Sequence, residues 1–179
     1  MDKNLENKIK NVLLECIDDS LDLIKKSSKE IFKITDKNEI IGDNPVTQID
    51  LNSQDLIVNK IKKQFPDHEI LGEEGKEEKK VKSDFLWIID PIDGTKNFIN
   101  QIPFYCVSIA VMHKKEIIGG AVGLPWEKKS VIYAIKNQGI KSNFAQKKFT
   151  KTSRFSSTRY FVICSNIFQF VIHSKKFFL

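Results

Sequence analysis

Asp90 and Asp93 are the two residues of this chain whose type and spacing best suit chemistry. Asp90 follows an apolar run at 85–89 that predicts a buried strand, and Pro91 favours an extended conformation at Asp90. Asp93 lies in a Pro-x-Asp-Gly turn that can bring its carboxylate close to the first. Mg²⁺ binds one or two carboxylates together with phosphate oxygens and water. The segment therefore predicts a site for a divalent cation beside a phosphate, at the carboxyl end of a strand.

Gly94 and Thr95 would complete such a site from the start of a helix. Gly94 lets the backbone approach a ligand closely, and the two amides would point at an anion. A purely structural turn is the alternative, because Pro-x-Asp-Gly turns are common in proteins that bind no metal.

A second acidic pair, Glu73-Glu74, follows a short apolar stretch and lies between Gly72 and Gly75. It offers a further carboxylate for the same cation site. A solvated charged loop is the alternative, because the run of lysines and glutamates at 76–80 follows directly.

Residues 70–75 and 87–111 resemble the two amino-terminal motifs of the inositol monophosphatase family. The similarity lies in the sequence DPIDGTKNF at 90–98, followed by Pro103 and by VSIA at 107–110. It covers roughly residues 5–140 in order and spacing. Members of this family are Mg²⁺-dependent, Li⁺-sensitive sugar phosphatases, and bisphosphate nucleotidases and fructose bisphosphatases are more distant relatives. The resemblance implies hydrolysis of a small phosphate monoester by in-line attack of water.

The resemblance also implies a metal-binding role for four residues. Glu73 resembles the glutamate that binds the first Mg²⁺ and orients the attacking water. Asp90 resembles the aspartate that bridges two ions, and Ile92 the residue that binds the first ion through its carbonyl. Asp93 resembles the ligand of the second ion, which also lies near a sugar hydroxyl of the substrate.

Three more residues are implied in substrate binding and catalysis. Gly94 and Thr95 match the amides that bind phosphate, and the Thr95 hydroxyl matches the group that helps to position water. Asp50 resembles the aspartate that supports Thr95 in this task, so the implied catalytic set is Glu73, Asp50 and Thr95. An N-cap on the helix that follows is the other interpretation of Asp50, and the two do not exclude each other.

The expected elements form an α/β protein, and the family resemblance implies a layered sandwich of the sugar phosphatase type. Apolar residues at helical spacing predict a first helix over 5–17, and a second is expected over 52–64. Strands are expected near 69–71, 85–89, 105–112, 117–122 and 131–135, with a bulge or close packing at Gly119-Gly120. Residues expected in the core are Trp87, Phe98, Phe104, Trp126, Cys106 and Cys164. Residues 1–143 would form a metal-binding domain, and 144–179 the remnant of a truncated second domain.

The net charge of +6 comes from the carboxyl-terminal part, because 11 of the 29 basic residues and no acidic residue follow Glu127. One interpretation is an arm that binds nucleic acid or an acidic partner, since aromatic residues are interspersed among these bases. The other is a truncated or frame-shifted end, which fits the eight phenylalanines among 13 that follow Asn143. Relatives supply a further aspartate from a second domain, so we expect weak binding of the first Mg²⁺ and low turnover.

The three cysteines have no metal or redox spacing, and the polar amino terminus predicts no signal peptide. The longest late apolar stretch, 160–172, is too short to span a membrane. We therefore expect a cytoplasmic protein with reduced thiols and no membrane partner. The family resemblance makes a homodimer possible as well.

Overall fold

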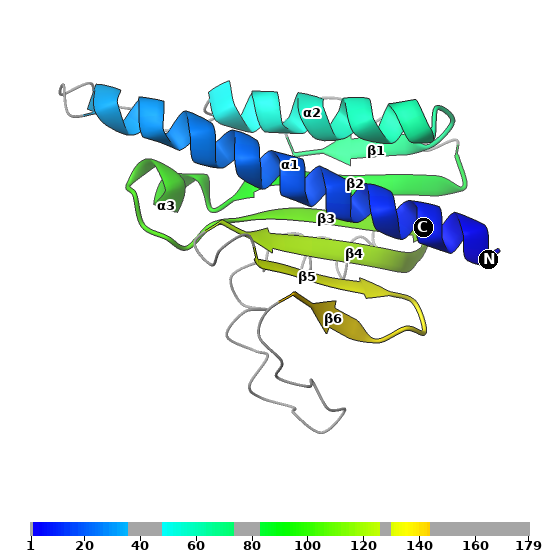
Figure 1. Ribbon diagram of the computed structural model, residues 1–179. Helices are drawn as coiled ribbons and strands as arrows, with labels where there is room; N and C mark the ends of the chain where they lie inside the picture. Colours follow the sequence, from blue (N-terminus) through cyan, green and yellow to red (C-terminus); the bar gives the residue numbers. More distant parts are fainter. Residues whose placement is uncertain (1, 36–47, 74–82, 126–129, 144–179) are drawn as a thin grey trace.

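The structure is a computed structural model that describes residues 2–35, 48–73, 83–125 and 130–143. Two long helices lie side by side on one face of a six-stranded sheet, and a short helix follows the end of one strand (Figure 1). The helices are α1 (Lys3–Thr35), α2 (Gln48–Gln64) and α3 (Thr95–Ile99). The strands are β1 (Glu69–Gly72), β2 (Phe85–Asp93), β3 (Cys106–His113), β4 (Glu116–Leu124), β5 (Ser130–Ile135) and β6 (Ile140–Ser142).

The strands lie in the order β1-β2-β3-β4-β5-β6. Strands β1 and β2 are parallel, whereas each later pair of neighbours is antiparallel. The predicted α/β class is confirmed. Since parallel strands end at the same edge of a sheet, the residues that follow β1 and those at the end of β2 come together.

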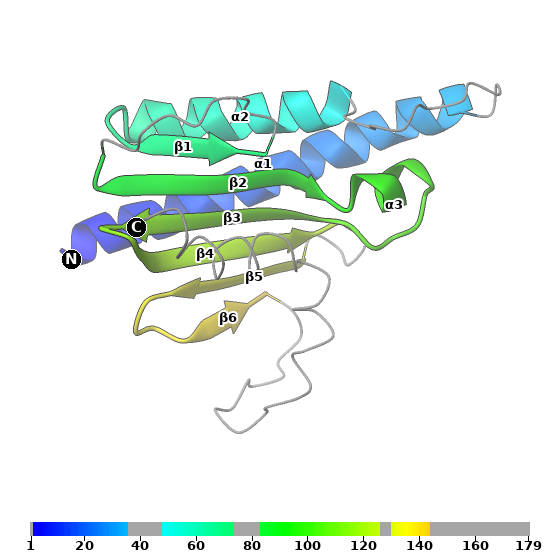
Figure 2. The same ribbon diagram turned by 180° about the vertical axis from the view of Figure 1, so that it is seen from behind.

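Strand β2 is buried on both faces, as its continuous apolar sequence predicted. Trp87 and Ile89 pack in the main core with the apolar face of α1, while Leu86 and Ile88 belong to a separate buried cluster. Figure 2 shows the face of the sheet that α1 and α2 do not cover. The sheet therefore buries apolar side chains on both of its faces.

Close packing of α1 on the sheet depends on glycine, as predicted for Gly119. A β-carbon there would lie 3.4 Å from Cδ1 of Leu13 on α1 and 2.9 Å from Cδ1 of Ile135 on β5, and the register of β3 against β4 shifts next to it. At Gly123 a β-carbon would lie 2.5 Å from Cγ2 of Ile17. Helix α1 therefore contacts the backbone of β4 directly.

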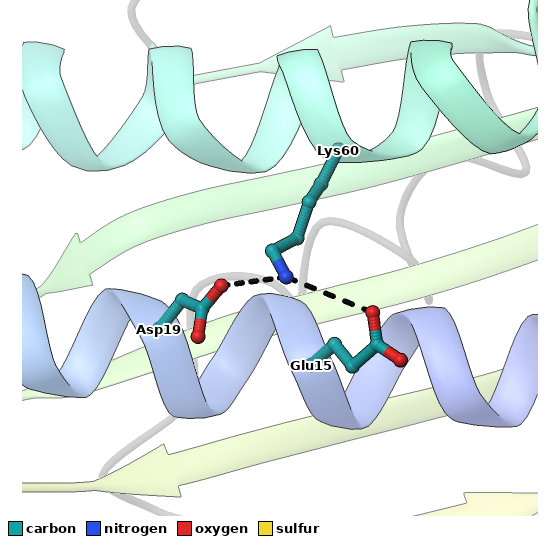
Figure 3. Close-up of polar contacts among 3 residues, drawn as sticks. All are labelled: Glu15, Asp19 and Lys60. Atoms are coloured by element: carbon teal, nitrogen blue, oxygen red, sulfur yellow. Dashed lines mark ion pairs between the residues drawn. The ribbon is translucent and has the colours of Figure 1, made fainter.

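The two long helices are also joined by an ion-pair cluster (Figure 3). Lys60 Nζ on α2 lies 2.6 Å from Asp19 Oδ2 and 3.6 Å from Glu15 Oε2 on α1. The lysine side chain is 30% exposed, so water screens these pairs and their contribution to stability is small.

Several sequence predictions need correction or lie outside the described residues. Helix α2 begins at Gln48, ahead of the predicted 52, and strand β6 was not predicted because three residues carry too little pattern. Phe104 is 55% exposed, so its assignment to the core is wrong, whereas Trp87, Phe98 and Cys106 are buried as expected. Residues predicted from sequence but outside the described part are Glu74, Trp126, Cys164 and the whole of 144–179.

Within the described part of the chain, no helix is both long enough and apolar enough to cross a membrane.

Candidate active site

The two aspartates of the motif lie within β2, and the prediction that this strand ends at Asp90 is wrong. Asp90 pairs with Ser108 and Asp93 with Cys106, so three steps along β2 match two steps along β3. Residues two apart in a strand share a face, and residues three apart do not. A β-bulge at 91–92 takes up the extra residue and brings both carboxylates to one face. Pro91 suits this place, because a bulge releases the backbone from the ladder.

Glu73 follows β1 at the same edge of the sheet. Its amide donates to the carbonyl oxygen of Ile89 over 3.2 Å, one residue before Asp90. The parallel register, with Gly72 opposite Ile89, therefore places Glu73 beside Asp90. Glu73 is exposed to solvent, whereas Asp90 is buried and only 3% exposed. The two carboxylates are therefore neighbours, one at the surface and one in the interior.

The electrostatics of this group are those of buried like charges. Burial, together with the charges of Glu73 and Asp93, raises the pKa of Asp90 to about 9. Burial and Glu73 raise the pKa of Asp93 to about 6. Two carboxylates this close repel each other while both are ionised, so the charge of Glu73 favours the protonated form of Asp90. The arrangement thus favours neutralisation by a proton or by a cation.

Thr95, Ile92 and Asp50 meet at the start of α3. The Thr95 hydroxyl lies 3.0 Å from the carbonyl oxygen of Ile92 and 3.3 Å from Asp50 Oδ1. A hydroxyl has one proton, so it donates to one of these acceptors at a time. Asp50 lies in the first turn of α2, which begins at Gln48, and the interpretation as an N-cap is wrong. The contact from α2 to Thr95 is the one that the family resemblance implied.

Gly94 has a backbone that a side chain would not tolerate. Its φ of 95° is in the left-handed region, and a β-carbon would lie 2.8 Å from the carbonyl oxygen of Phe104. Glycine is therefore required both for the conformation and for the close approach of the neighbouring chain.

The donor set fits a hard divalent cation, although no group of three or more His, Cys, Asp or Glu in the described residues is arranged as a ready metal cluster. Asp90 Oδ1 is buried and finds no hydrogen-bond partner within the described part of the chain. A buried carboxylate oxygen without a donor is costly unless a cation binds it. Residues that would hold Mg²⁺ are Glu73, Asp90, Asp93 and the carbonyl of Ile92, all of them oxygen donors.

Cys106 is a neighbour of the site that the sequence analysis assigned to the core alone. Its thiol lies 4.0 Å from Asp93 Oδ2, and it is fully buried. The residue is found through its position opposite Asp93 in the sheet, which depends on the bulge and leaves no signal in the sequence.

The site therefore consists of neighbouring carboxylates at the edge of a mixed sheet, next to a glycine turn that begins α3. The chain belongs to the inositol monophosphatase family, whose sequence model matches residues 6–168. This is a family of phosphatases, and membership confirms the predicted resemblance. The match continues beyond residue 143 into the basic carboxyl-terminal part.

Individual relatives agree with this assignment. The chain is 44% identical over 94 residues to a fructose-1,6-bisphosphatase/inositol-1-monophosphatase of Thermotoga maritima, covering 52% of this chain and 35% of the relative. It is 39% identical over 98 residues to the Nus factor SuhB of Pasteurella multocida, covering 55% and 36%. The inositol monophosphatase of Anabaena (Nostoc) sp. PCC 7120 superposes with a TM-score of 0.66 at 26% identity, covering 84% of this chain and 52% of that one. The chain thus aligns with about half of a solved relative.

Proposed function

We propose that this chain acts as a Mg²⁺-dependent phosphoric monoester hydrolase on a small inositol, sugar or nucleotide phosphate. The observation that carries the proposal is the bulge in β2, which brings Asp90 and Asp93 to one face beside Glu73. Family membership supports the same chemistry. The buried thiols Cys16 and Cys106 are free, which fits the cytoplasmic location that we propose with it.

Each residue contributes position or charge. Glu73, Asp90, Asp93 and the carbonyl oxygen of Ile92 would hold the Mg²⁺. The amides of Gly94 and Thr95 bind the phosphoryl oxygens. The Thr95 hydroxyl, within reach of Asp50 Oδ1, orients the attacking water.

Bound Mg²⁺ would lower the pKa of water and stabilise the charge that develops on the leaving oxygen. The protein itself needs little covalent chemistry, since phosphoryl transfer depends mainly on positioning and electrostatics.

The test is phosphate release from inositol 1-phosphate with and without Mg²⁺. Asp93→Asn removes a ligand, and Asp84→Asn is the matched control because Asp84 lies just before β2, is 64% exposed and pairs with Lys114. We expect Mg²⁺-dependent release that Asp93→Asn abolishes and Asp84→Asn leaves intact. Absence of release, or release that survives Asp93→Asn, would contradict the proposal.

A second candidate is a binding protein that uses its basic carboxyl-terminal part. The observation that favours it is the concentration of 11 basic residues and no acid after Glu127. The similarity to a protein named as a Nus factor is consistent with it. RNA affinity that falls steeply with salt, in a chain without phosphatase activity, would support this candidate over the first.

A further inference from the structure

We propose that Asn97 is a positioning residue for the phosphate-binding turn at Gly94 and Thr95. The inference rests on the proposed function, because it assumes that this turn binds phosphate. Asn97 lies in α3, and the loop at 100–105 returns the chain from that helix to β3.

Asn97 holds this loop through both its side chain and its backbone. Its side-chain Nδ2 donates to the carbonyl oxygen of Phe104 over 2.7 Å. Its own carbonyl oxygen accepts from the amide of Ile102 over 2.8 Å. One residue of the helix therefore fixes the loop at two points.

The loop itself is tightly turned. Gln101 has a φ of 57°, in the left-handed region. The Phe104 amide donates to the carbonyl oxygen of Ile102 over 2.7 Å, which makes a γ-turn around Pro103. The loop is therefore compact, with its hydrogen bonds made over a few residues.

The loop lies directly against the backbone of Gly94. Asn97 donates to the carbonyl oxygen of Phe104, and a β-carbon added to Gly94 would lie 2.8 Å from this oxygen. The same β-carbon would lie 3.3 Å from Cα of Tyr105. The Phe104 carbonyl is thus placed between the Asn97 amide and the Gly94 backbone. A displacement of the loop would change the conformation at Gly94 and the direction of the two phosphate-binding amides.

Apolar packing holds the end of the loop, where the Tyr105 ring lies edge-on to the buried Phe98 ring at a centroid distance of 5.0 Å, but it holds the middle of the loop less. The side chains of Ile102 and Phe104 are 43% and 55% exposed. In the middle of the loop, hydrogen bonds therefore contribute to its position, and the bond from Asn97 is the one that holds the carbonyl oxygen facing Gly94.

The test compares two asparagines on the same short segment. Asn97→Leu removes the donor to Phe104 without adding charge. Asn100→Leu is the matched control. Asn100 Nδ2 makes a similar hydrogen bond, over 2.8 Å, but it donates to the carbonyl oxygen of Lys96 and not to that of Phe104. We expect Asn97→Leu to raise KM for the phosphate ester about tenfold, the value of one net hydrogen bond, and to leave kcat and the melting temperature nearly unchanged. A merely structural role would instead lower the active fraction and so kcat, with KM retained.

A titration with inorganic phosphate, followed by NMR at the Gly94 and Thr95 amides, separates this inference from the proposed function. Phosphate binding that weakens in Asn97→Leu and persists in Asn100→Leu supports the inference, even in a chain that shows no turnover. Equal phosphate affinity in wild type and Asn97→Leu would overturn it, as would the absence of a response of these amides in wild type. Should Asn97→Leu fail to fold, Asn97→Ala carries the same prediction, because it deletes the donor without adding bulk.

Discussion

The two ends of strand β2 bury polar groups in opposite ways. At the amino end, His68 is stacked between Phe65 and Phe85, at centroid distances of 4.4 and 4.3 Å. Its Nδ1 accepts a hydrogen bond from Trp87 Nε1 over 3.0 Å. At the carboxyl end, Asp90 is buried with its neighbours Glu73 and Asp93, and its Oδ1 has no partner among the described residues.

Burial disfavours the charged form of His68 at one end and of Asp90 at the other. The two ends differ in whether neighbouring residues satisfy the buried group. His68 stays neutral, because burial lowers its pKa to about 4, and Trp87 satisfies its bare nitrogen. Asp90 Oδ1 has no such donor in the described part of the chain, and Asp93 Oδ2 faces the weak thiol donor of Cys106 at 4.0 Å. The unsatisfied oxygen of Asp90 is therefore the feature of β2 that supports the proposed cation site.

The largest expected effect comes from removing the charge at the unsatisfied end. Asp90→Asn should lower Mg²⁺ affinity and hydrolysis by more than about a hundredfold, since even an outer-shell partner of a metal contributes about 10–100-fold. The same change should raise the melting temperature of the metal-free protein by about 2–4 °C for each kcal/mol of relieved burial cost. Thermal unfolding in a chelator measures the second effect. A metal-free Asp90→Asn that is less stable than wild type would contradict the comparison.

At the satisfied end, the corresponding change should act in the opposite direction. Trp87→Phe keeps most of the apolar volume but deletes the donor to His68. The buried Nδ1 then loses its partner, so we expect a loss of about 1–3 kcal/mol in the free energy of unfolding. Chemical denaturation is the measurement, and Mg²⁺ affinity should stay unchanged as an internal control.

The two ends should also respond oppositely to pH. Between the unperturbed pKa of 6.5 and the folded value of about 4, the unfolded chain binds a proton at His68 that the folded chain does not. Stability from His68 is therefore complete above pH 6.5 and is lost as the pH falls towards 4, by at most about 1.4 kcal/mol per pH unit. Asp90, with a raised pKa, lowers metal-free stability as the pH rises from 3.8 towards 9. In Asp90→Asn, Asp93 with its pKa of about 6 still lowers stability as the pH rises from 3.8 to 6. The histidine effect is therefore the difference between the melting curves of Asp90→Asn with His68 and with His68→Phe.

The smallest expected effect concerns a contact far from both ends. Lys60→Met breaks the pairs with Asp19 and Glu15, but these groups are largely in contact with water. We expect a loss of about 0.2–1 kcal/mol and no change in Mg²⁺ binding. A larger loss would mean that the helix pair, and with it Asp50, depends on this cluster.

Much of this arrangement could be predicted from local pattern. The five longer strands and the two long helices follow from apolar periodicity, and the family resemblance identified Glu73, Asp90, Asp93 and Thr95 as a group. These features depend on residues close in sequence, which a single chain makes visible.

The features that escaped prediction depend on pairing between distant segments. The bulge that turns Asp90 and Asp93 to one face exists only against Ser108 and Cys106 on β3. The contact of Cys106 with Asp93 depends on the same register of β2 against β3. The exposure of Phe104 depends on the course of the loop before β3. Apolar composition alone assigns such residues to the core, because it contains no information on which partner lies opposite.

We propose that the unsatisfied end of β2 binds a divalent cation. The most direct measurement is a calorimetric titration of Mg²⁺ at pH 7.5, in two buffers that differ in ionisation enthalpy. A carboxyl group protonated in the metal-free state must lose its proton when a cation replaces it, so we predict saturable binding with release of about one proton. Asp90→Asn should show neither binding nor release. Absence of binding to the wild-type chain, or binding that Asp90→Asn retains, would contradict the claim.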